Sequence, residues 1–292
     1  MTTPGGVRRA HGARARTLLA RLCELHPEPG REHWYAAVLC GEVRVDGERV
    51  RDPRRMVTDA SAVAVQPEPP LASRAGYKLL HALERFRVPV AGKVVLDAGS
   101  ATGGFTDCLL RRGARHVHCV DVAYGALAYR LRSDSRTTVH ERTNVMHLQP
   151  GSLRPQPDGA VCDLSFRSLR GAAARLLNLT REGWLLALVK PQFEWRAATG
   201  PAHGAGTRRF DGLVRGAEAI AAVVRALQAD LALEGVEFRR CTPAALPGRR
   251  GNREVLALLT AARSVPAEVS DMVDTVDTVD TVDTLRNELE SY

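Results

Sequence analysis

The sequence predicts an α/β protein with a mostly parallel, seven-stranded sheet, preceded by a small α+β domain. Two observations lead to this fold class. From residue 71 to about 264, short β-branched and aliphatic runs alternate with segments of helical periodicity, the pattern of a parallel sheet with crossover helices. A glycine-rich turn follows the first of these runs, where such a sheet forms a ligand pocket outside the carboxyl ends of its strands.

Length, composition and charge restrict the class of protein. The chain has 292 residues, 45% of them hydrophobic, which is enough for one full-sized domain plus a small domain or a tail. No apolar run is long enough to span a membrane. The net charge of +8 and the isoelectric point near 9.6 favour a polyanionic partner, nucleic acid first and an anionic membrane surface second.

The cysteines and the N-terminus bear on the compartment. The six cysteines are scattered and form no C-x-x-C pair: Cys23, Cys40, Cys108, Cys119, Cys162 and Cys241. Several of them lie in apolar strand segments, and the N-terminal sequence is not that of a signal peptide. We therefore expect reduced, buried thiols in a cytosolic protein and no metal site. Residues 1–23 are arginine-rich and acid-free, as in transit peptides, but their helical apolar spacing favours the first helix of an RNA-binding fold.

Residues 13–65 are predicted to form the small domain. A helix is followed by a second, short helix through residues 34–39. Residues 41–50 are predicted to form a hairpin, because valines alternate with polar residues around the two-residue turn signal Asp46-Gly47. We therefore expect two helices and at least one hairpin in this domain.

A proline-rich linker, residues 66–72, separates the small domain from the large one, residues 73–264. Strands are predicted in the large domain at residues 93–97, 116–121, 137–141, 160–164, 184–190, 235–239 and 254–259. Helices are predicted near residues 103–112, 124–133, 168–179 and 211–230. The last two strands fit an antiparallel pair, and the Gly-, Pro- and Arg-rich residues 241–252 between them are expected to face substrate.

Residues 265–292 form an acidic, low-complexity tail. The triplet Val-Asp-Thr occurs four times from Val273 to Thr284, and the period of three matches neither a helix nor a strand. Charge of a single sign favours solvation over packing. We expect this tail to be largely disordered and inessential, with folding back onto the basic surface as the alternative.

The glycine-rich turn lies in the run VVLDAGSATGGFTD from Val94 to Asp107. It lacks the G-x-G-x-x-G spacing that cradles a dinucleotide pyrophosphate, so it suits a smaller cofactor. The motif resembles the first motif of S-adenosylmethionine-dependent methyltransferases. A tight strand-to-helix turn without a ligand remains the alternative for this motif alone.

Polar residues also end the following strands. Asp121 ends the second strand, where a carboxylate can accept both ribose hydroxyls of a nucleoside, and Asn144 follows the third and can border the adenine. An acid at a strand end often caps the next helix, but several in one register point to a site. The expected cofactor-binding residues are Asp97, Gly99, Ser100, Thr102, Gly103, Gly104, Phe105, Asp121, Val122 and Asn144.

Lysine is rare in this chain. Of the 41 lysines and arginines only Lys78, Lys93 and Lys190 are lysine, so positive charge alone is supplied by arginine. Arginine is never deprotonated in proteins, whereas a desolvated lysine can act as a base. Lys93 stands beside a glycine at a strand start and needs no role. We interpret Lys78 and Lys190 as site residues, with Asp163 expected to hold both amines.

Residues 73–259 resemble the TlyA family of ribosomal RNA 2′-O-methyltransferases, which is related to the FtsJ methyltransferases. The matching segments are Ser73–Leu79, Ser100–Asp107, Asp121–Gly125, Glu141–Asn144, Asp163–Leu169, Val189–Glu194 and Gly251–Glu254. The chain departs from the family pattern at Gly30, Ala75, Tyr77 and in the linker at 67–70, all outside the cofactor motif.

The resemblance implies a Rossmann-like, seven-stranded methyltransferase sheet whose final pair is antiparallel. It implies S-adenosylmethionine as cofactor, ribosomal RNA or ribosomal subunits as partner, and a cytoplasmic location. The family's Lys-Asp-Lys-Glu tetrad falls on Lys78, Asp163, Lys190 and Glu254. Residues 13–65 correspond to the family's N-terminal RNA-binding module.

Arginines are the expected RNA contacts. They are Arg14, Arg16, Arg21, Arg31, Arg44 and Arg49 on the small domain, and Arg239, Arg240, Arg249, Arg250 and Arg253 on the rim of the large one. Two other functions stay open: a ribosome-binding assembly factor without catalysis, and a small-molecule O-methyltransferase. Some family members are labelled haemolysins, but the sequence contains no spanning segment that would make a pore.

Overall fold

The computed structural model describes residues 15–28, 30–65, 71–165, 167–195, 211–248, 251–262 and 282–290. The chain divides into two compact units, Met1–Pro69 and Pro70–Tyr292. Arg14, Arg249 and Arg250, three of the expected RNA contacts, lie outside the described residues.

The small unit contains two helices and short strands. In chain order these are β1 (Arg16–Thr17), α1 (Leu18–Leu25), α2 (Arg31–Cys40), β2 (Val43–Val45), β3 (Glu48–Val50), β4 (Met56–Val57) and β5 (Val63–Val65). The predicted hairpin is confirmed as β2–β3, and its turn residues Asp46 and Gly47 both have positive φ, as a two-residue hairpin turn requires. β5 pairs with the other edge of β2, and β1 pairs with β4; neither pairing was predicted.

The large unit is a seven-stranded mixed sheet in the order β11-β12-β10-β9-β6-β7-β8. Its strands are β6 (Val94–Ala98), β7 (His116–Val120), β8 (Thr137–His140), β9 (Gly159–Cys162), β10 (Trp184–Val189), β11 (Val236–Pro243) and β12 (Val255–Ala261). β6 to β10 run parallel, while β12 inserts antiparallel between β10 and β11. All seven predicted strands and the antiparallel final pair are therefore confirmed.

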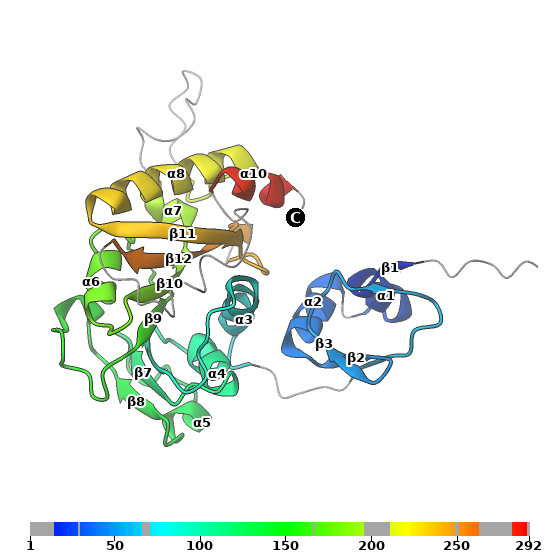
Figure 1. Cartoon of the computed structure of the whole chain (residues 1–292), viewed down its shortest axis with the longest axis horizontal. Helices are drawn as coiled ribbons and strands as arrows, with labels where there is room; N and C mark the ends of the chain where they lie inside the picture. The colour runs from blue at the N-terminus through cyan, green and yellow to red at the C-terminus, as the bar shows by residue number, and fades with distance from the viewer. Residues whose placement is uncertain are drawn as a thin grey trace, which may run out of the picture. The chain divides into compact units, whose positions relative to one another are not determined.

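Helices cover both faces of this sheet (Figure 1). They are α3 (Arg74–Phe86), α4 (Gly104–Arg111), α5 (Tyr129–Arg132), α6 (Ala173–Asn178), α7 (Pro191–Glu194), α8 (Ala217–Leu233) and α10 (Val282–Glu290), with a 3₁₀ turn at Val145–His147. The helix predicted near 124–133 is only one turn long. The residues before it turn at Gly125, whose φ is +70°, and follow the Asp121 carboxylate, which binds the Ala123 amide.

Three helices were not predicted: α3, the one-turn α7 and α10. In α3, Leu79, Leu83 and Phe86 follow the spacing of a buried helix face. α10 contradicts the expected disorder for residues 282–290, since Leu285 and Leu289 are each 1% exposed within the core that α8 and β11 build. Val282, in the last Val-Asp-Thr triplet, is buried with them. Residues 265–281 of the predicted tail lie outside the described residues.

Candidate active site at the carboxyl edge of the sheet

The glycine turn after β6 is shaped by backbone contacts. Gly99 has φ +87°, and a Cβ at this position would lie 2.6 Å from the carbonyl oxygen of Asp163. Gly103 also has positive φ, +93°, and a Cβ there would lie 2.8 Å from Leu127 Cδ1 and still closer to Leu131. A side chain at Gly99 would collide with rigid backbone, so the turn needs glycine there. The turn brings β6 and β9 together at their carboxyl ends.

The acid that ends β7 is positioned as the sequence predicts. The two carboxylate oxygens of Asp121 accept hydrogen bonds from the amides of Ala101 and Ala123, at 2.8 and 2.7 Å. These contacts hold the carboxylate between the glycine turn and the chain after β7. Val122 is 69% exposed and free to contact a ligand. Asn144 caps the 3₁₀ turn after β8, accepting from the Met146 amide at 3.0 Å.

The remaining residues of the glycine motif differ in exposure. Thr102 is exposed, and Ser100 is buried at 6% exposure. Phe105 is 2% exposed, so its ring packs in the interior. Gly104 contacts α3, because a Cβ there would collide with Ser73 Oγ and lie 2.9 Å from the amide nitrogen of Gly76.

Asp97 is completely buried at the end of β6. Its Oδ2 accepts a 2.6 Å hydrogen bond from Thr106, while its Oδ1 accepts none within the described parts of the chain. Burial raises the pKa of Asp97 to about 7; the Thr106 hydrogen bond opposes this shift, and the charges of Asp163 and Asp121 add to it. The Asp97 carboxyl group is therefore partly protonated near neutral pH.

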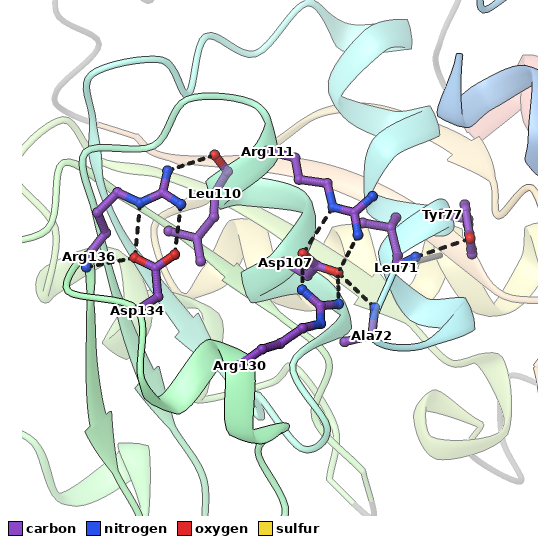
Figure 2. Close-up of polar contacts among 9 residues, drawn as sticks. All are labelled: Leu71, Ala72, Tyr77, Asp107, Leu110, Arg111, Arg130, Asp134 and Arg136. Carbon is purple, nitrogen blue, oxygen red and sulfur yellow. Dashed lines mark hydrogen bonds and ion pairs between the residues drawn. The ribbon is translucent and has the colours of Figure 1, made fainter. Parts of the chain in front are cut away.

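Asp107 connects the elements around the glycine motif (Figure 2). Its buried carboxylate accepts from the Ala72 amide at 2.8 Å, from Arg111 Nε at 3.1 Å and from Arg130 Nη1 at 2.9 Å. Burial alone raises the pKa of Asp107, but these donors lower it below its ordinary value. The start of α3, the helix α4 and the turn α5 are thus joined through one carboxylate, which the sequence analysis left without a role.

Lys190 and Asp163 form the first of two lysine–carboxylate pairs. Lys190 Nζ lies 2.6 Å from Asp163 Oδ1 and donates to Ser165 Oγ at 3.1 Å. The pair follows from register, since the parallel pairing of Ala187 with Cys162 brings the ends of β10 and β9 side by side. The lysine side chain is 11% exposed and the aspartate 24%, so the pair remains accessible to solvent.

Lys78 and Glu254 form the second pair. Lys78 Nζ lies 2.5 Å from Glu254 Oε2, and the two side chains are only 8% and 6% exposed. The expectation that Asp163 holds both lysines is therefore wrong, because Lys78 has its own carboxylate. Val189 pairs with Val255 in the antiparallel β10–β12 ladder. The next position in this register places Lys190 opposite Glu254, so both lysine–carboxylate pairs lie at the same edge of the sheet.

Glycines explain how α3 brings Lys78 to this edge. A Cβ at Gly76 would lie 2.5 Å from the carbonyl oxygen of Gly104, so α3 and α4 cross with their backbones in contact. Arg74 donates to the carbonyl of Pro247 at 3.3 Å, which ties the start of α3 to the chain before β12. Two elements far apart in sequence thereby bring Lys78 to Glu254.

Glu194 supports the chain on the other side of the Lys190 pair. It is 2% exposed and accepts from Ser168 Oγ at 2.5 Å, from the Leu169 amide at 2.8 Å and from Arg170 at 2.8 Å. These contacts anchor the end of the segment that begins at Asp163. Glu194 lies in a segment that matches the family, but a single glutamate in a sequence does not predict this hydrogen-bond network.

The arginines differ in their availability for phosphate. Arg16 is ion-paired with both Glu24 and Asp59, and Arg21 lies 3.5 Å from Asp59. Arg240 is 7% exposed, so its expected role on the rim is wrong. The others in the described ranges divide as follows: Arg31 and Arg49 are exposed, Arg44 is half-buried, Arg239 is paired with Glu237, and Arg253 donates to the Leu289 carbonyl.

The cysteines lie apart from this edge or within the core. Cys108, Cys119, Cys162 and Cys241 are buried and unbridged, and Cys23 is half-buried and unbridged. Burial raises the pKa of Cys119 to about 12, so its thiol stays protonated. Among the residues the structure describes, no three His, Cys, Asp or Glu side chains are grouped to hold a metal ion.

Comparison with known proteins gives concordant matches. Residues 71–239 match the family model described as FtsJ-like methyltransferase. The 16S/23S rRNA (cytidine-2′-O)-methyltransferase TlyA of Mycobacterium tuberculosis is 41% identical over 218 residues, 73% of this chain and 78% of the relative. Hemolysin A of Brachyspira hyodysenteriae is 36% identical over 159 residues, covering 54% of this chain and 66% of the relative.

A solved structure has the same fold. A protein described as a candidate hemolysin from Streptococcus thermophilus has a TM-score of 0.62 at 27% identity, covering 95% of this chain and 98% of its own. Within the described ranges, no helix is both long and apolar enough to cross a membrane.

Proposed function

Because this chain belongs to the FtsJ-like methyltransferase family, we propose that it methylates ribose 2′-hydroxyls of ribosomal RNA, using S-adenosylmethionine. The observation that carries the proposal is the pair of lysine–carboxylate contacts, Lys190–Asp163 and Lys78–Glu254, at one sheet edge beside the glycine turn. A protein that only bound the ribosome would have no chemical need for them.

The residues around the turn fit a nucleoside cofactor with an uncharged linkage. Asp97 Oδ1 is a buried oxygen that accepts no hydrogen bond from the described residues, and the Asp121 carboxylate and the exposed Val122 lie at the neighbouring strand end. The proposal assigns the ribose hydroxyls to Asp121, the adenine to Val122 and Asn144, and the amino-acid part to residues 99–102. S-adenosylmethionine supplies an electrophilic methyl group when bound there.

Lys190 is the group we assign to the ribose 2′-hydroxyl. Forming the ether at the 2′ oxygen releases one proton, which must pass to a nearby base or to water. The Lys190 amine can hydrogen-bond the oxygen and, when uncharged, accept this proton, while Asp163 and Ser165 fix its direction. Lys78 and Glu254 align the nucleotide from the next strand.

The proposed partner is the ribosomal subunit, and the proposed compartment is the cytoplasm. The net charge of +8 suits a phosphate backbone. On the small unit, Arg44 and Arg49 lie opposite each other in the β2–β3 hairpin, which places two guanidinium groups on one short segment. Arg16 and Arg21 are ion-paired within the unit.

The product of methyl transfer tests this proposal. Isolated ribosomal subunits lacking the modification would be incubated with the protein and methyl-labelled S-adenosylmethionine, and the RNA digested to nucleosides. We expect label in 2′-O-methyl ribonucleosides, with no label when free nucleosides or small hydroxylated metabolites replace the subunits. Label confined to a base methyl group, or to a small molecule, would contradict the assignment.

A further inference from the structure

The C-terminal helix α10 connects two elements that meet at the active site. Its inner face is apolar, with Val282, Leu285 and Leu289 all buried, and it packs on α8 and β11 (Figure 1). A helix that only covered core would need nothing more than these contacts. α10 also places polar groups on α3 and on the residue before Glu254.

Glu288 makes the contact to α3. Its carboxylate forms an ion pair with Arg85 and lies 3.5 Å from Thr242 Oγ1 on β11. The Arg85 and Glu288 side chains are 28% and 21% exposed, so solvent screens this ion pair only in part. Arg85 follows Lys78 by seven residues on the same helix, which is two helical turns and hence the same face.

The main chain of α10 makes the second contact. The carbonyl of Leu289 accepts a hydrogen bond from Arg253, whose neighbour is Glu254. Thr242, the third partner, pairs with Leu256 in the β11–β12 ladder, two residues after Glu254. α10 therefore holds α3 and the start of β12 at once, and these are the two elements that carry Lys78 and Glu254.

We propose that Glu288 is a positioning residue, and that α10 keeps Lys78 and Glu254 together by fixing α3 against β12. The consequence for catalysis rests on the proposed function, but the consequence for the lysine does not. Without the ion pair, α3 loses one of the contacts that hold it against β12, and the 2.5 Å contact between Lys78 and Glu254 opens more often.

The scarcity of lysine makes this directly measurable. Native full-length protein would be treated with limiting acetic anhydride, and the labelling rates of Lys78, Lys93 and Lys190 followed by mass spectrometry. Lys93, paired with Glu182 at 2.5 Å on the far end of β6, is the internal reference. The variants are Glu288→Gln and, as the matched control, Glu290→Gln, which removes an exposed charge paired with Arg286 on the same helix.

We expect Glu288→Gln to raise labelling of Lys78 relative to Lys93 by about tenfold, because labelling of a buried amine follows its opening. Glu290→Gln should leave the ratio unchanged, and Lys190 should change little in either variant. The same Glu288→Gln protein should lose about tenfold in kcat with KM for S-adenosylmethionine unchanged, since only alignment is lost.

Equal Lys78 labelling in the two variants would overturn the positioning role, whatever the methyl-transfer assay shows. If Lys78 becomes reactive in Glu288→Gln while neither variant nor the native protein methylates ribosomal RNA, the positioning role stands and the proposed function fails.

Discussion

The two lysine–carboxylate pairs have the same chemistry but different surroundings. Lys190 and Asp163 lie on neighbouring parallel strands, and the aspartate is 24% exposed. Lys78 and Glu254 are 176 residues apart, and both are nearly inaccessible to solvent. The first pair depends on strand register and can reach a substrate, while the second depends on how α3 and β12 pack. We therefore expect the first pair to dominate catalysis and the second to dominate stability.

Removing the Lys190 amine tests the catalytic half of this comparison and should have the largest effect. Lys190→Ala should lower kcat by roughly 10²–10⁴-fold, the usual contribution of a general base or its equivalent. Binding of S-adenosylmethionine, measured by calorimetry, should be unchanged because the amine lies on another strand. A kcat within tenfold of the native value would show that the accessible pair is not the catalytic one.

Neutralising Glu254 tests the stability half. Glu254→Gln leaves a buried ammonium without its counter-charge and should cost about 3–5 kcal/mol in the free energy of unfolding. Asp163→Asn, at the more exposed pair, should cost about 1 kcal/mol or less. Urea denaturation of both variants gives the comparison.

The double substitution Lys78→Met with Glu254→Leu separates burial from function. It should recover most of the stability lost in Glu254→Gln, because no charge is then buried alone. Methyl transfer should stay low. Equal destabilisation by Glu254→Gln and Asp163→Asn would remove the distinction between the pairs.

The protonation of Asp97, beside the accessible pair, is the next largest effect. Its pKa is raised in the folded state, to about 7, so the stabilising protonated form is lost as the pH rises through 7. From pH 5 to pH 8 the native protein should lose about 2–3 kcal/mol that Asp97→Asn does not lose. Urea unfolding at both pH values measures this, and parallel losses in the two proteins would contradict it.

Histidines on β7 and β8 make the free energy of unfolding depend on pH below neutrality. His118 is fully buried; its Nδ1 lies 3.2 Å from His140 Nε2, and its Nε2 lies 2.8 Å from the Pro155 carbonyl oxygen. Burial lowers the pKa of His118 to about 4. A lowered histidine pKa gives stability above pH 6.5 that is lost as the pH falls, about 2 kcal/mol between pH 7 and pH 5. His118→Gln should show a smaller loss over this range, and an equal loss would contradict the assignment.

The periodicity of the strands and the residues at their ends predicted the sheet and part of the candidate site. All seven strands, Asp121 and the Lys190–Asp163 pair follow from local patterns, because parallel strands bring their carboxyl ends to one edge. The pairing of Lys78 with Glu254 has no local signal, since it depends on the crossing of α3 and α4 at Gly76.

Packing also decided α3 and α10, two of the helices that the sequence did not predict. Gly76 weakens the helical signal of α3, and its small size is needed for contact with Gly104. In α10, Leu285 and Leu289 follow the triplet repeat, whose period of three predicts no helix. Their burial against α8 and β11 stabilises the helix. The motif also does not predict the orientation of the Phe105 ring, which packs in the interior.

The central claim is that the two pairs at the carboxyl edge together carry ribose 2′-O-methylation of ribosomal RNA. The most direct test is single-turnover transfer of labelled methyl to ribosomal subunits by the native protein, Lys78→Ala and Lys190→Ala, with S-adenosylmethionine binding measured in parallel. We predict label in 2′-O-methyl nucleosides for the native protein, and its loss in both variants, which still bind the cofactor. Undiminished transfer by either variant would contradict the claim.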